Sequence, residues 1–413
     1  MFDISGKSIA TGGPSGSPLI HIAPDAANSS TGHRASMESD EASGASSKRR
    51  APSRLATGED YSEHVIGIHG LTRALSPVKA LDIVRDEFQL GFSDQTYGRP
   101  LLAVTLQRGS ALSALNKTAG ILPCVMVGIA EGDDVEVPDG FDILLSSVPD
   151  LPSPWVWSGD VAASMESLGE RVQSSPLASV ALVQLLRLGK TLSLRDAIVA
   201  ESFVYSMLQA GPTFHEWLRS RHTSPKKYPE PDPVLVSRQG EHLEIELNRP
   251  RVRNALNAAM RDALITALQI VLVDDSVRSA RISGSGPAFC SGGDLNEFGL
   301  AQDPATAHSV RVARSVGALL SQCADRVDMD VHGACVGAGI EIAAFSNRIT
   351  ATSNAVFSLP EIGFGLIPGA GGTASLPRRI GRHRTAYMAI TGTRISALTA
   401  LEWGLVDEVR DRY

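Results

Sequence analysis

Residues 331–345, VHGACVGAGIEIAAF, place three glycines between a strand-like run and an apolar segment that contains a carboxylate. Gly333, Gly337 and Gly339 predict a backbone that turns tightly or approaches another segment closely. The residues that follow are typical of the start of a buried helix, whose first N–H groups favour negative charge. Glu341 is therefore either an acid stabilised by a helix N-terminus or a catalytic group.

A second glycine turn, AFCSGGDLNEF at residues 288–298, also leads into a helix. Two such turns can aim two backbone N–H groups at one oxygen atom, which is the geometry of an oxyanion hole. The alternative is a dinucleotide-binding loop. However, GACVGAG at residues 333–339 does not spell G-x-G-x-x-G, and neither turn is followed by an acid at the required spacing. We therefore favour the oxyanion hole.

A second carboxylate lies in the glycine-rich stretch FSLPEIGFGLIPGAGGT, residues 357–373. By itself, Glu361 is typical of a capping or ion-paired surface acid. Together with Glu341 it forms a pair of carboxylates in apolar surroundings. Such surroundings can push two pKa values apart and leave one group as acid and the other as base.

The composition sets bounds on the class of protein. The chain has 413 residues, 43% of them hydrophobic, which is enough for two domains and a large core. A net charge of −7 argues against nucleic-acid binding, and no apolar run is long enough to span a membrane. The four cysteines show neither CxxC pairing nor metal-ligand spacing, so we expect reduced thiols in a cytoplasmic protein.

The sequence divides into four segments. Residues 1–58 are rich in Ser, Gly, Ala and Pro, and we predict that they are disordered. Residues 59–222 begin with short buried strands and end in a helical region at 176–221, where Ser193 is a candidate N-cap. Residues 223–233 form a proline-rich linker. In residues 234–413 strands alternate with helices, which predicts an α/β architecture with parallel strands.

Two smaller features follow the linker. Apolar residues at positions 256, 260, 264, 268 and 272 mark one face of a helix, with Asn254 as its predicted N-cap. Further along, Arg378, Arg379 and Arg382 form a basic cluster. The alternatives are a contact with CoA phosphates or with a neighbouring subunit, and we favour a solvated face.

Four consecutive motifs resemble one known family. They are NRPRVRNALN (248–257), GPAFCSGGDLNEF (286–298), HGACVGAGIEIAAF (332–345) and LPEIGFGLIPGAGGTASLPRRIG (359–381). In this order and spacing, they are similar to the crotonase (enoyl-CoA hydratase/isomerase) superfamily over about residues 232–413. The resemblance implies a spiral of ββα units and an acyl-CoA thioester as substrate.

The resemblance also implies roles for particular residues. The oxyanion hole would be formed by the backbone N–H groups of Gly293 and Ala338. Glu341 would act as the base toward water, Glu361 would protonate the α-carbon, and Gly369 would help to hold the water. The residues implied to line the CoA and acyl entrance are Arg253, Ala255, Leu256, Asp294, Leu295 and Asn296.

The sequence departs from the family pattern in two places. Ala338 replaces a common glycine, which is tolerated unless its φ is positive. The sequence ends at Tyr413, before the family's usual C-terminal helical segment, whereas residues 174–221 look like that segment. We therefore expect residues 59–222 to be a degenerate crotonase-like unit whose helices cover the second core. The alternative is an unrelated helical hairpin.

The sequence thus predicts an enoyl-CoA hydratase that adds water syn to a 2-enoyl-CoA and gives 3-hydroxyacyl-CoA. The alternatives are an isomerase or other crotonase chemistry, and a non-catalytic acyl-CoA-binding partner protein. No metal or redox cofactor is implied. We expect a homo-oligomer that binds neither nucleic acid nor membrane.

Overall fold

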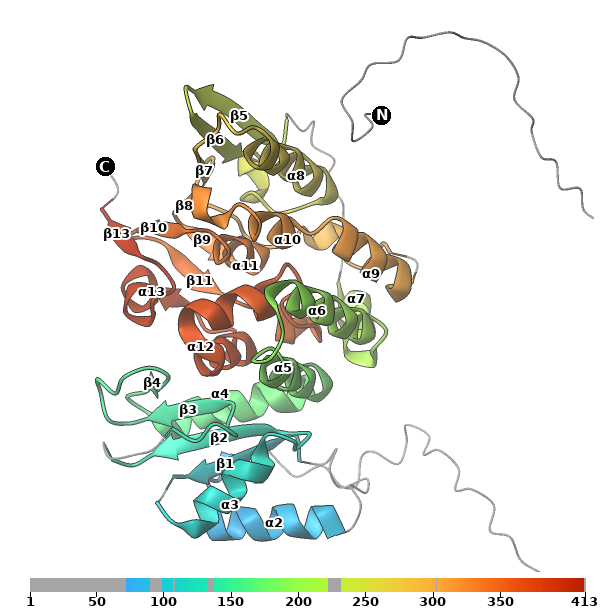
Figure 1. The fold of residues 1–413 in the computed structure, drawn as a ribbon. Coiled ribbons are helices and arrows are strands. Elements are labelled where there is room, and N and C mark those ends of the chain that lie inside the picture. Colours follow the sequence, from blue (N-terminus) through green and yellow to red (C-terminus); the bar gives the residue numbers. More distant parts are fainter. Residues whose placement is uncertain are drawn as a thin grey trace, which may run out of the picture. The chain divides into compact units, whose positions relative to one another are not determined.

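The structure is a computed structural model that describes residues 72–89, 99–106, 108–132, 137–221, 232–301 and 303–411. The predicted disordered segment, residues 1–58, and most of the predicted linker lie outside the described residues. All described residues belong to one compact unit, Gly58–Tyr413 (Figure 1). Within the described ranges, no helix has both the length and the apolar character of a membrane span.

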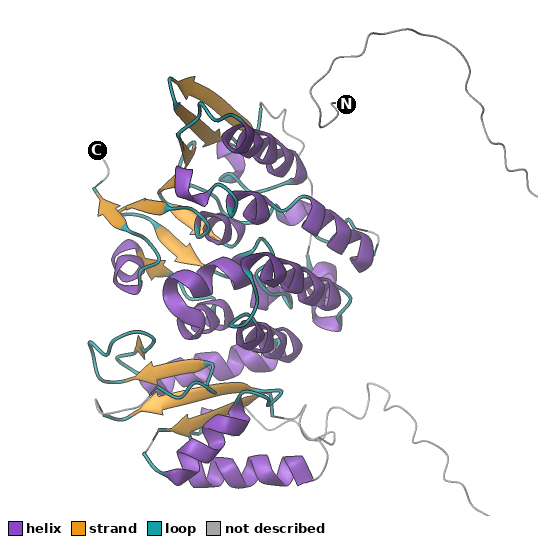
Figure 2. Ribbon diagram, in the orientation of Figure 1, coloured by secondary structure: helices purple, strands orange, loops and turns teal. Residues whose placement is uncertain are grey.

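The N-terminal half is built on a parallel sheet. Its elements are α2 (Pro77–Gln89), β1 (Leu101–Thr105), α3 (Ser110–Ala119), β2 (Val125–Ala130), β3 (Ile143–Ser146), β4 (Val156–Trp157), α4 (Val161–Ser174), α5 (Pro176–Leu188), α6 (Leu194–Gln209) and α7 (Pro212–Ser220). Strands β1 to β4 pair in chain order, all parallel. Leu102 and Val104 pack with α2 and α3, whereas Leu101 and Ala103 belong to a cluster that includes α4 and α5. Helices thus cover both faces, as a parallel sheet requires (Figure 2).

The predicted helical region at 176–221 is confirmed as α5, α6 and α7. The predicted cap is confirmed too, because the Ser193 side chain accepts a hydrogen bond from the Asp196 N–H at 3.1 Å. Helices α5 and α6 pack on a helix of the C-terminal half, α12 (Gly372–Thr391). The same hydrophobic cluster runs from the N-terminal sheet into the C-terminal core, so the two halves share one interior.

The C-terminal half contains two sheets and the helices between their strands. Its strands are β5 (Val234–Gln239), β6 (His242–Leu247), β7 (Ser279–Gly284), β8 (Val327–Val331), β9 (Ala334–Val336), β10 (Arg348–Thr352), β11 (Val356–Ser358), β12 (Ile395–Ser396) and β13 (Glu408–Arg410). Its helices, besides α12, are α8 (Ala258–Val273), α9 (Pro304–Ala313), α10 (Val316–Leu320), α11 (Ala338–Ala343) and α13 (Ala397–Trp403), with short 3₁₀ turns η1 (Pro250–Val252), η2 (Leu295–Glu297), η3 (Ala324–Arg326) and η4 (Glu361–Phe364). One sheet has the order β13-β10-β8-β7-β6-β5 and the other β12-β11-β9. These elements build the ββα spiral that the sequence predicts.

The chain crosses from the large sheet to the small one between β8 and β9. Gly333 makes the bend at φ 55°, and a Cβ there would lie 2.2 Å from the Pro287 carbonyl oxygen. No side chain fits at that distance, so only glycine allows the crossing. Strand β9 then runs straight into α11, which carries Glu341.

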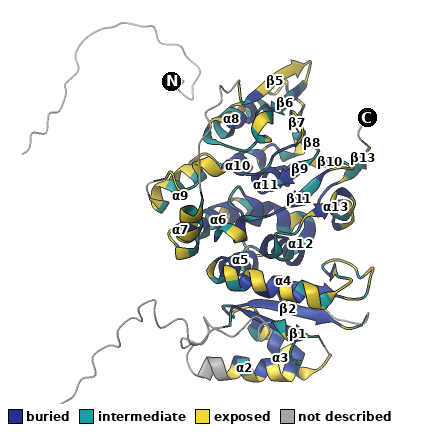
Figure 3. Cartoon of the chain, turned by 180° about the vertical axis from the view of Figure 1, so that it is seen from behind, coloured by how far each residue is buried: buried dark blue, intermediate teal, exposed yellow. Residues whose placement is uncertain are grey.

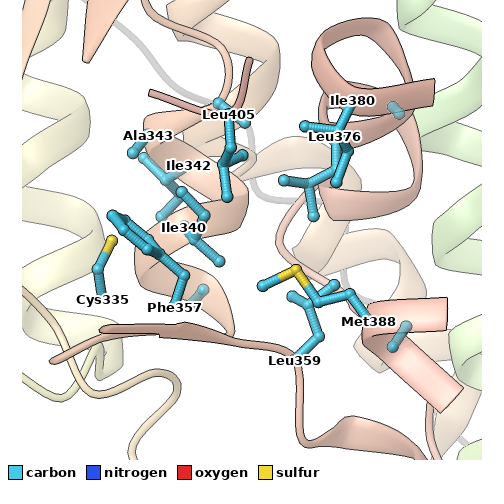
Figure 4. Close-up of a cluster of buried hydrophobic side chains, with 14 of the residues drawn as sticks. Cys335, Ile340, Ile342, Ala343, Phe357, Leu359, Leu376, Ile380, Met388 and Leu405 are labelled. Atoms are coloured by element: carbon cyan, nitrogen blue, oxygen red, sulfur yellow. The ribbon is translucent and has the colours of Figure 1, made fainter. Parts of the chain in front are cut away.

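Apolar packing fixes α11 against α12. Ile340 and Ile342 of α11 lie near Phe357 of β11, and Leu376 and Met388 of α12 face them across the core (Figure 4). Every residue of α11 is buried, and much of α12 is buried too (Figure 3). A carboxylate on α11 is therefore enclosed by the core.

The predicted N-cap of α8 is wrong. Helix α8 begins at Ala258, and its cap is Asn257, whose side chain accepts a hydrogen bond from the Met260 N–H at 2.9 Å. Asn254 is fully buried with φ 54°, and its Nδ2 donates to the carbonyl oxygen of Ala288 at 2.9 Å. Asparagine tolerates the left-handed region better than most residues, so this position shapes the preceding loop instead.

The basic cluster on α12 is not a solvated face. Arg382 is 7% exposed, and its Nη1 lies 3.5 Å from Oδ1 of Asp142 in the N-terminal half. Arg379 donates to the carbonyl oxygen of Ser346 at 2.7 Å and pairs with Asp407 at 3.1 Å. The sequence interpretation failed because the partners of these cations are distant along the chain.

Candidate active site

The two glycine turns lie side by side. The Cys290 N–H donates to the carbonyl oxygen of Ala334 at 3.0 Å, and the Val336 N–H donates back to the Cys290 carbonyl oxygen at 2.9 Å. A Cβ at Gly339 would lie 2.8 Å from that Cys290 oxygen. Gly337 has φ 49°, a conformation that glycine adopts without strain. Glycines thus permit both the turn and the close contact.

Each turn offers one free backbone donor. Ala338 is the first residue of α11, where an N–H has no partner within the helix. Among the described residues, neither the Gly293 N–H nor the Ala338 N–H donates a hydrogen bond. The φ of Ala338 is not positive, so alanine brings no backbone strain at this position. The two donors predicted for an oxyanion hole therefore lie unpaired on adjacent turns.

Glu341 is 2% exposed and receives two hydrogen bonds from backbone N–H groups. Its Oε2 accepts from the Ala370 N–H at 2.7 Å and from the Gly372 N–H at 3.0 Å. Burial, followed by the nearby negative charges of Glu361 and Glu201, raises the pKa of Glu341 well above its usual value. The two N–H donors oppose that rise because they stabilise the charged form.

Glu361 is 8% exposed, and its carboxyl group lies against Gly337, in the same turn that leads to Glu341. A Cβ at Gly337 would lie 2.4 Å from Glu361 Oε1. Its Oε2 is buried and has no hydrogen-bond partner in the described part of the chain. Burial is the largest cause that raises the pKa of Glu361 to about 8. The structure thus brings the two predicted catalytic glutamates to the turn that carries Ala338.

A third buried carboxylate, Glu201 of α6, was missed by the sequence reasoning. It is 1% exposed, and its Oε1 accepts from the Gly371 N–H at 2.7 Å. Its Oε2 accepts from the Thr373 N–H at 2.8 Å and from the Thr373 hydroxyl at 2.7 Å. Burial raises the pKa of Glu201 to about 7. The sequence feature that could have indicated Glu201 is its position as the only acidic residue in the largely apolar stretch AIVAESFVY, 197–205.

Gly369 lies beside α6, the helix that carries Glu201. A Cβ at Gly369 would lie 2.4 Å from the ring of Tyr205, which is one turn after Glu201 on α6. The backbone of Gly369–Gly371 also borders a cavity of about 420 Å³. Leu256, Ile342 and residues of α6 and α9 are also part of its lining. Its volume is in the range of small-molecule sites, about 300–1,000 Å³.

The predicted entrance residues form two neighbouring loops. Leu256 pairs with Gly293, since its N–H donates to the carbonyl oxygen of Gly292 at 2.8 Å. Asp294 is buried, and Arg249 Nη1 lies 3.0 Å from its Oδ2, so this carboxylate holds the loops together.

The other predicted entrance residues lie further out. Arg253, Leu295 and Asn296 are exposed, and the Ala255 carbonyl oxygen accepts a hydrogen bond from the Arg249 guanidinium. Arg221, the residue after α7, donates a hydrogen bond to the Leu295 carbonyl oxygen at 2.6 Å and so fixes this loop. Arg249 and Arg221 were not singled out in the sequence.

Comparisons with known proteins show which family the sequence resembles. The sequence profile of the enoyl-CoA hydratase/isomerase family matches residues 238–412. The 2,3-dehydroadipyl-CoA hydratase of Escherichia coli (strain K12) is 38% identical over 176 residues, 43% of this chain and 68% of that protein. The chain belongs to the enoyl-CoA hydratase/isomerase family. Glu201 lies outside the residues that the family profile matches.

Other relatives show that the family spans more than one activity. The 1,2-epoxyphenylacetyl-CoA isomerase of Escherichia coli (strain K12) is 35% identical over 41% of this chain and 66% of that protein. The crystal structure of the enoyl-CoA hydratase from Thermoplasma volcanium GSS1 matches with 34% identity and a TM-score of 0.41, covering 44% of this chain and 73% of that one. The chain spans about two thirds of the length of the two Escherichia coli relatives.

Proposed function

We propose that the chain is an enoyl-CoA hydratase, which adds water syn across the double bond of a 2-enoyl-CoA thioester to give 3-hydroxyacyl-CoA. The observation that carries this proposal is the pair Glu341 and Glu361, both buried and both next to the turn whose Ala338 N–H is unpaired. Family membership and the relatives named as hydratases support it.

The hydrogen bonds suggest which glutamate is the base. Two backbone N–H groups on Glu341 stabilise its carboxylate form, whereas Glu361 Oε2 has no donor among the described residues. Two interacting carboxylates that cannot both ionise share one proton as a pair. We therefore place the proton on Glu361 and the negative charge on Glu341, so that Glu361 is the acid at neutral pH.

In the proposed reaction, Glu341 takes a proton from water while the water oxygen bonds to the β-carbon. The double-bond electrons move toward the thioester oxygen, where the Gly293 and Ala338 N–H groups stabilise the enolate charge. Glu361 then gives its proton to the α-carbon, and a proton returned from Glu341 to Glu361 resets the pair. Losing one oxyanion donor costs on the order of 10²–10³ in rate in other enzymes.

The acyl chain would occupy the cavity of about 420 Å³ beside Gly369–Gly371. Leu256 lines this cavity and also pairs with Gly293, which supports placing the acyl chain there. The thioester oxygen would then lie at the two N–H groups, with the chain directed toward α6 and α9.

The test is the turnover of crotonyl-CoA, followed by the loss of enoyl-thioester absorbance and by mass spectrometry in ¹⁸O-labelled water. We expect 3-hydroxybutyryl-CoA carrying one ¹⁸O atom, and a loss of turnover in Glu361→Gln. If neither crotonyl-CoA nor longer enoyl-CoA esters lose absorbance, the hydratase proposal is rejected.

The same assay separates the alternatives. A shifted double bond without ¹⁸O uptake would identify an isomerase, an activity that some relatives carry. Binding of the ester without any turnover would favour a non-catalytic acyl-CoA-binding protein.

A further inference from the structure

A short backbone segment connects two of the buried carboxylates. We call residues 370–373, at the start of α12, the amide strip. Its first and third N–H groups donate to Glu341, and its second and fourth donate to Glu201. The N–H groups at a helix N-terminus attract negative charge, and here two side chains from different parts of the sequence share them. The strip therefore cannot shift toward one carboxylate without changing its bonds to the other.

Helix α6 fixes this strip with two side chains on one face. Glu201 and Tyr205 are four residues apart, which places them one above the other on a helix. Glu201 binds the strip through three hydrogen bonds, and the Tyr205 ring lies against Gly369, the residue before the strip. Both contacts hold the backbone that stabilises Glu341.

Side chains other than Glu201 also attach α6 to its neighbours. A separate polar group joins α6 to α9, where Arg311 donates to the hydroxyl oxygens of Ser202 and Ser206 at 3.0 Å each. The guanidinium of Arg311 also lies over the Tyr205 ring, 4.3 Å from its centroid. Within the described residues, no lysine or arginine forms an ion pair with Glu201. A buried carboxylate without an ion-pair partner is costly to keep if its only role is to attach a helix.

We propose that Glu201 is a positioning residue for the reaction: it holds the amide strip in the place where two N–H groups meet the Glu341 carboxylate. This inference rests on the proposed function of Glu341 as a base. It also means that the family-matched segment, residues 238–412, depends on a side chain from α6 to orient its base. A general base displaced by about 1 Å can lose on the order of 10² in rate.

The test compares Glu201→Gln with Ser206→Ala in the full chain, using kcat and KM for crotonyl-CoA. The Gln amide presents N–H groups toward a strip that itself donates, so we expect kcat to fall about 10–100-fold with KM within about two-fold. Ser206→Ala removes a buried hydrogen bond from the same helix without touching the strip, and should leave both constants near the parent values. Glu201→Asp keeps two acceptor oxygens and should recover part of the lost kcat.

Hydrogen–deuterium exchange of the peptide that spans the strip gives a readout that does not need activity. We expect faster exchange in Glu201→Gln and parent-like exchange in Ser206→Ala. If Glu201→Gln does not fold, Thr373→Val removes one of the three bonds and should show a smaller change in the same direction. If the strip peptide exchanges as slowly in Glu201→Gln as in the parent, the inference is overturned, even if the parent shows no hydratase activity. Parent-like kcat alongside an inactive Glu341→Gln overturns the inference alone and leaves the proposed function standing.

Discussion

Two regions of the molecule bury carboxylates in different surroundings: the group around Asp142, and the candidate active site. Asp142, the residue before β3, is 1% exposed, and Arg187 donates to its Oδ1 at 2.8 Å while Arg382 lies 3.5 Å away. At the candidate active site, Glu341 and Glu361 are buried almost as fully, yet no cation lies within ion-pair distance of either one among the described residues.

The difference teaches how to distinguish a structural acid from a reactive one. A buried carboxylate beside arginines keeps its charge compensated and fixes the chain. A buried carboxylate without a nearby cation is stabilised either by taking up a proton or by accepting hydrogen bonds from backbone N–H groups. In both cases it can still exchange protons. The predictions below test this contrast, beginning with the largest effect.

Glu341→Gln should cause the largest change. Removal of the proposed general base is expected to lower kcat for crotonyl-CoA by about 10²–10⁴-fold, the usual contribution of such groups. Gln can accept the N–H bonds of the strip through its carbonyl oxygen, so the variant should remain folded. A near-parent kcat, measured with a parent-like circular dichroism spectrum, would show that this carboxylate is not the base.

Asp142→Asn should show the opposite pattern. The variant leaves Arg187 and Arg382 without their buried partner, which typically costs about 3–5 kcal/mol of unfolding free energy. The kcat of the folded protein should stay near the parent value. Urea titration and an assay below the transition measure both quantities, and a selective loss of kcat would contradict the structural role.

The stability of the parent should fall as pH rises. Burial raises the pKa of Glu361 from 4.5 to about 8 in the folded chain, so folding favours the protonated form. That contribution is fully present below about pH 4.5 and is lost as the pH passes through about 8. Glu361→Gln stays neutral, so its melting temperature should exceed that of the parent by more at pH 9 than at pH 5. Equal differences at the two pH values would mean that Glu361 is ionised in both states.

The smallest expected effects come from the helix caps. Ser193→Ala on α6 and Ser396→Ala on α13 each remove one N-cap bond, and each should cost about 0.5–2 kcal/mol of unfolding free energy. Similar losses in urea titration would show that both halves unfold as one structure. A first, separate transition in Ser193→Ala alone would show instead that the N-terminal half unfolds on its own.

Local sequence signals predicted much of the core. Some features depend only on residues within a few positions of one another, so the sequence indicates them directly. They are the glycine turns, both catalytic candidates and the Ser193 cap. Asn254 shows the limit of local evidence, because asparagine suits both an N-cap and a left-handed turn, and only the fold chooses between them.

Distant partners could not be predicted in this way. Glu201 and Gly371 are 170 positions apart, and Arg382 and Asp139 are 243 apart. Nothing in either local stretch specifies its partner, so a buried carboxylate was overlooked and a buried arginine was assigned to the surface.

The most direct test of the account is whether a carboxyl group in the C-terminal core holds a proton at neutral pH. Infrared spectroscopy detects the C=O stretch of a protonated carboxyl group. We expect such a band in the parent at pH 7, with its intensity reduced in Glu361→Gln and retained in Asp142→Asn. Absence of the band in the parent at pH 7, or its presence unchanged in Glu361→Gln, would contradict the account.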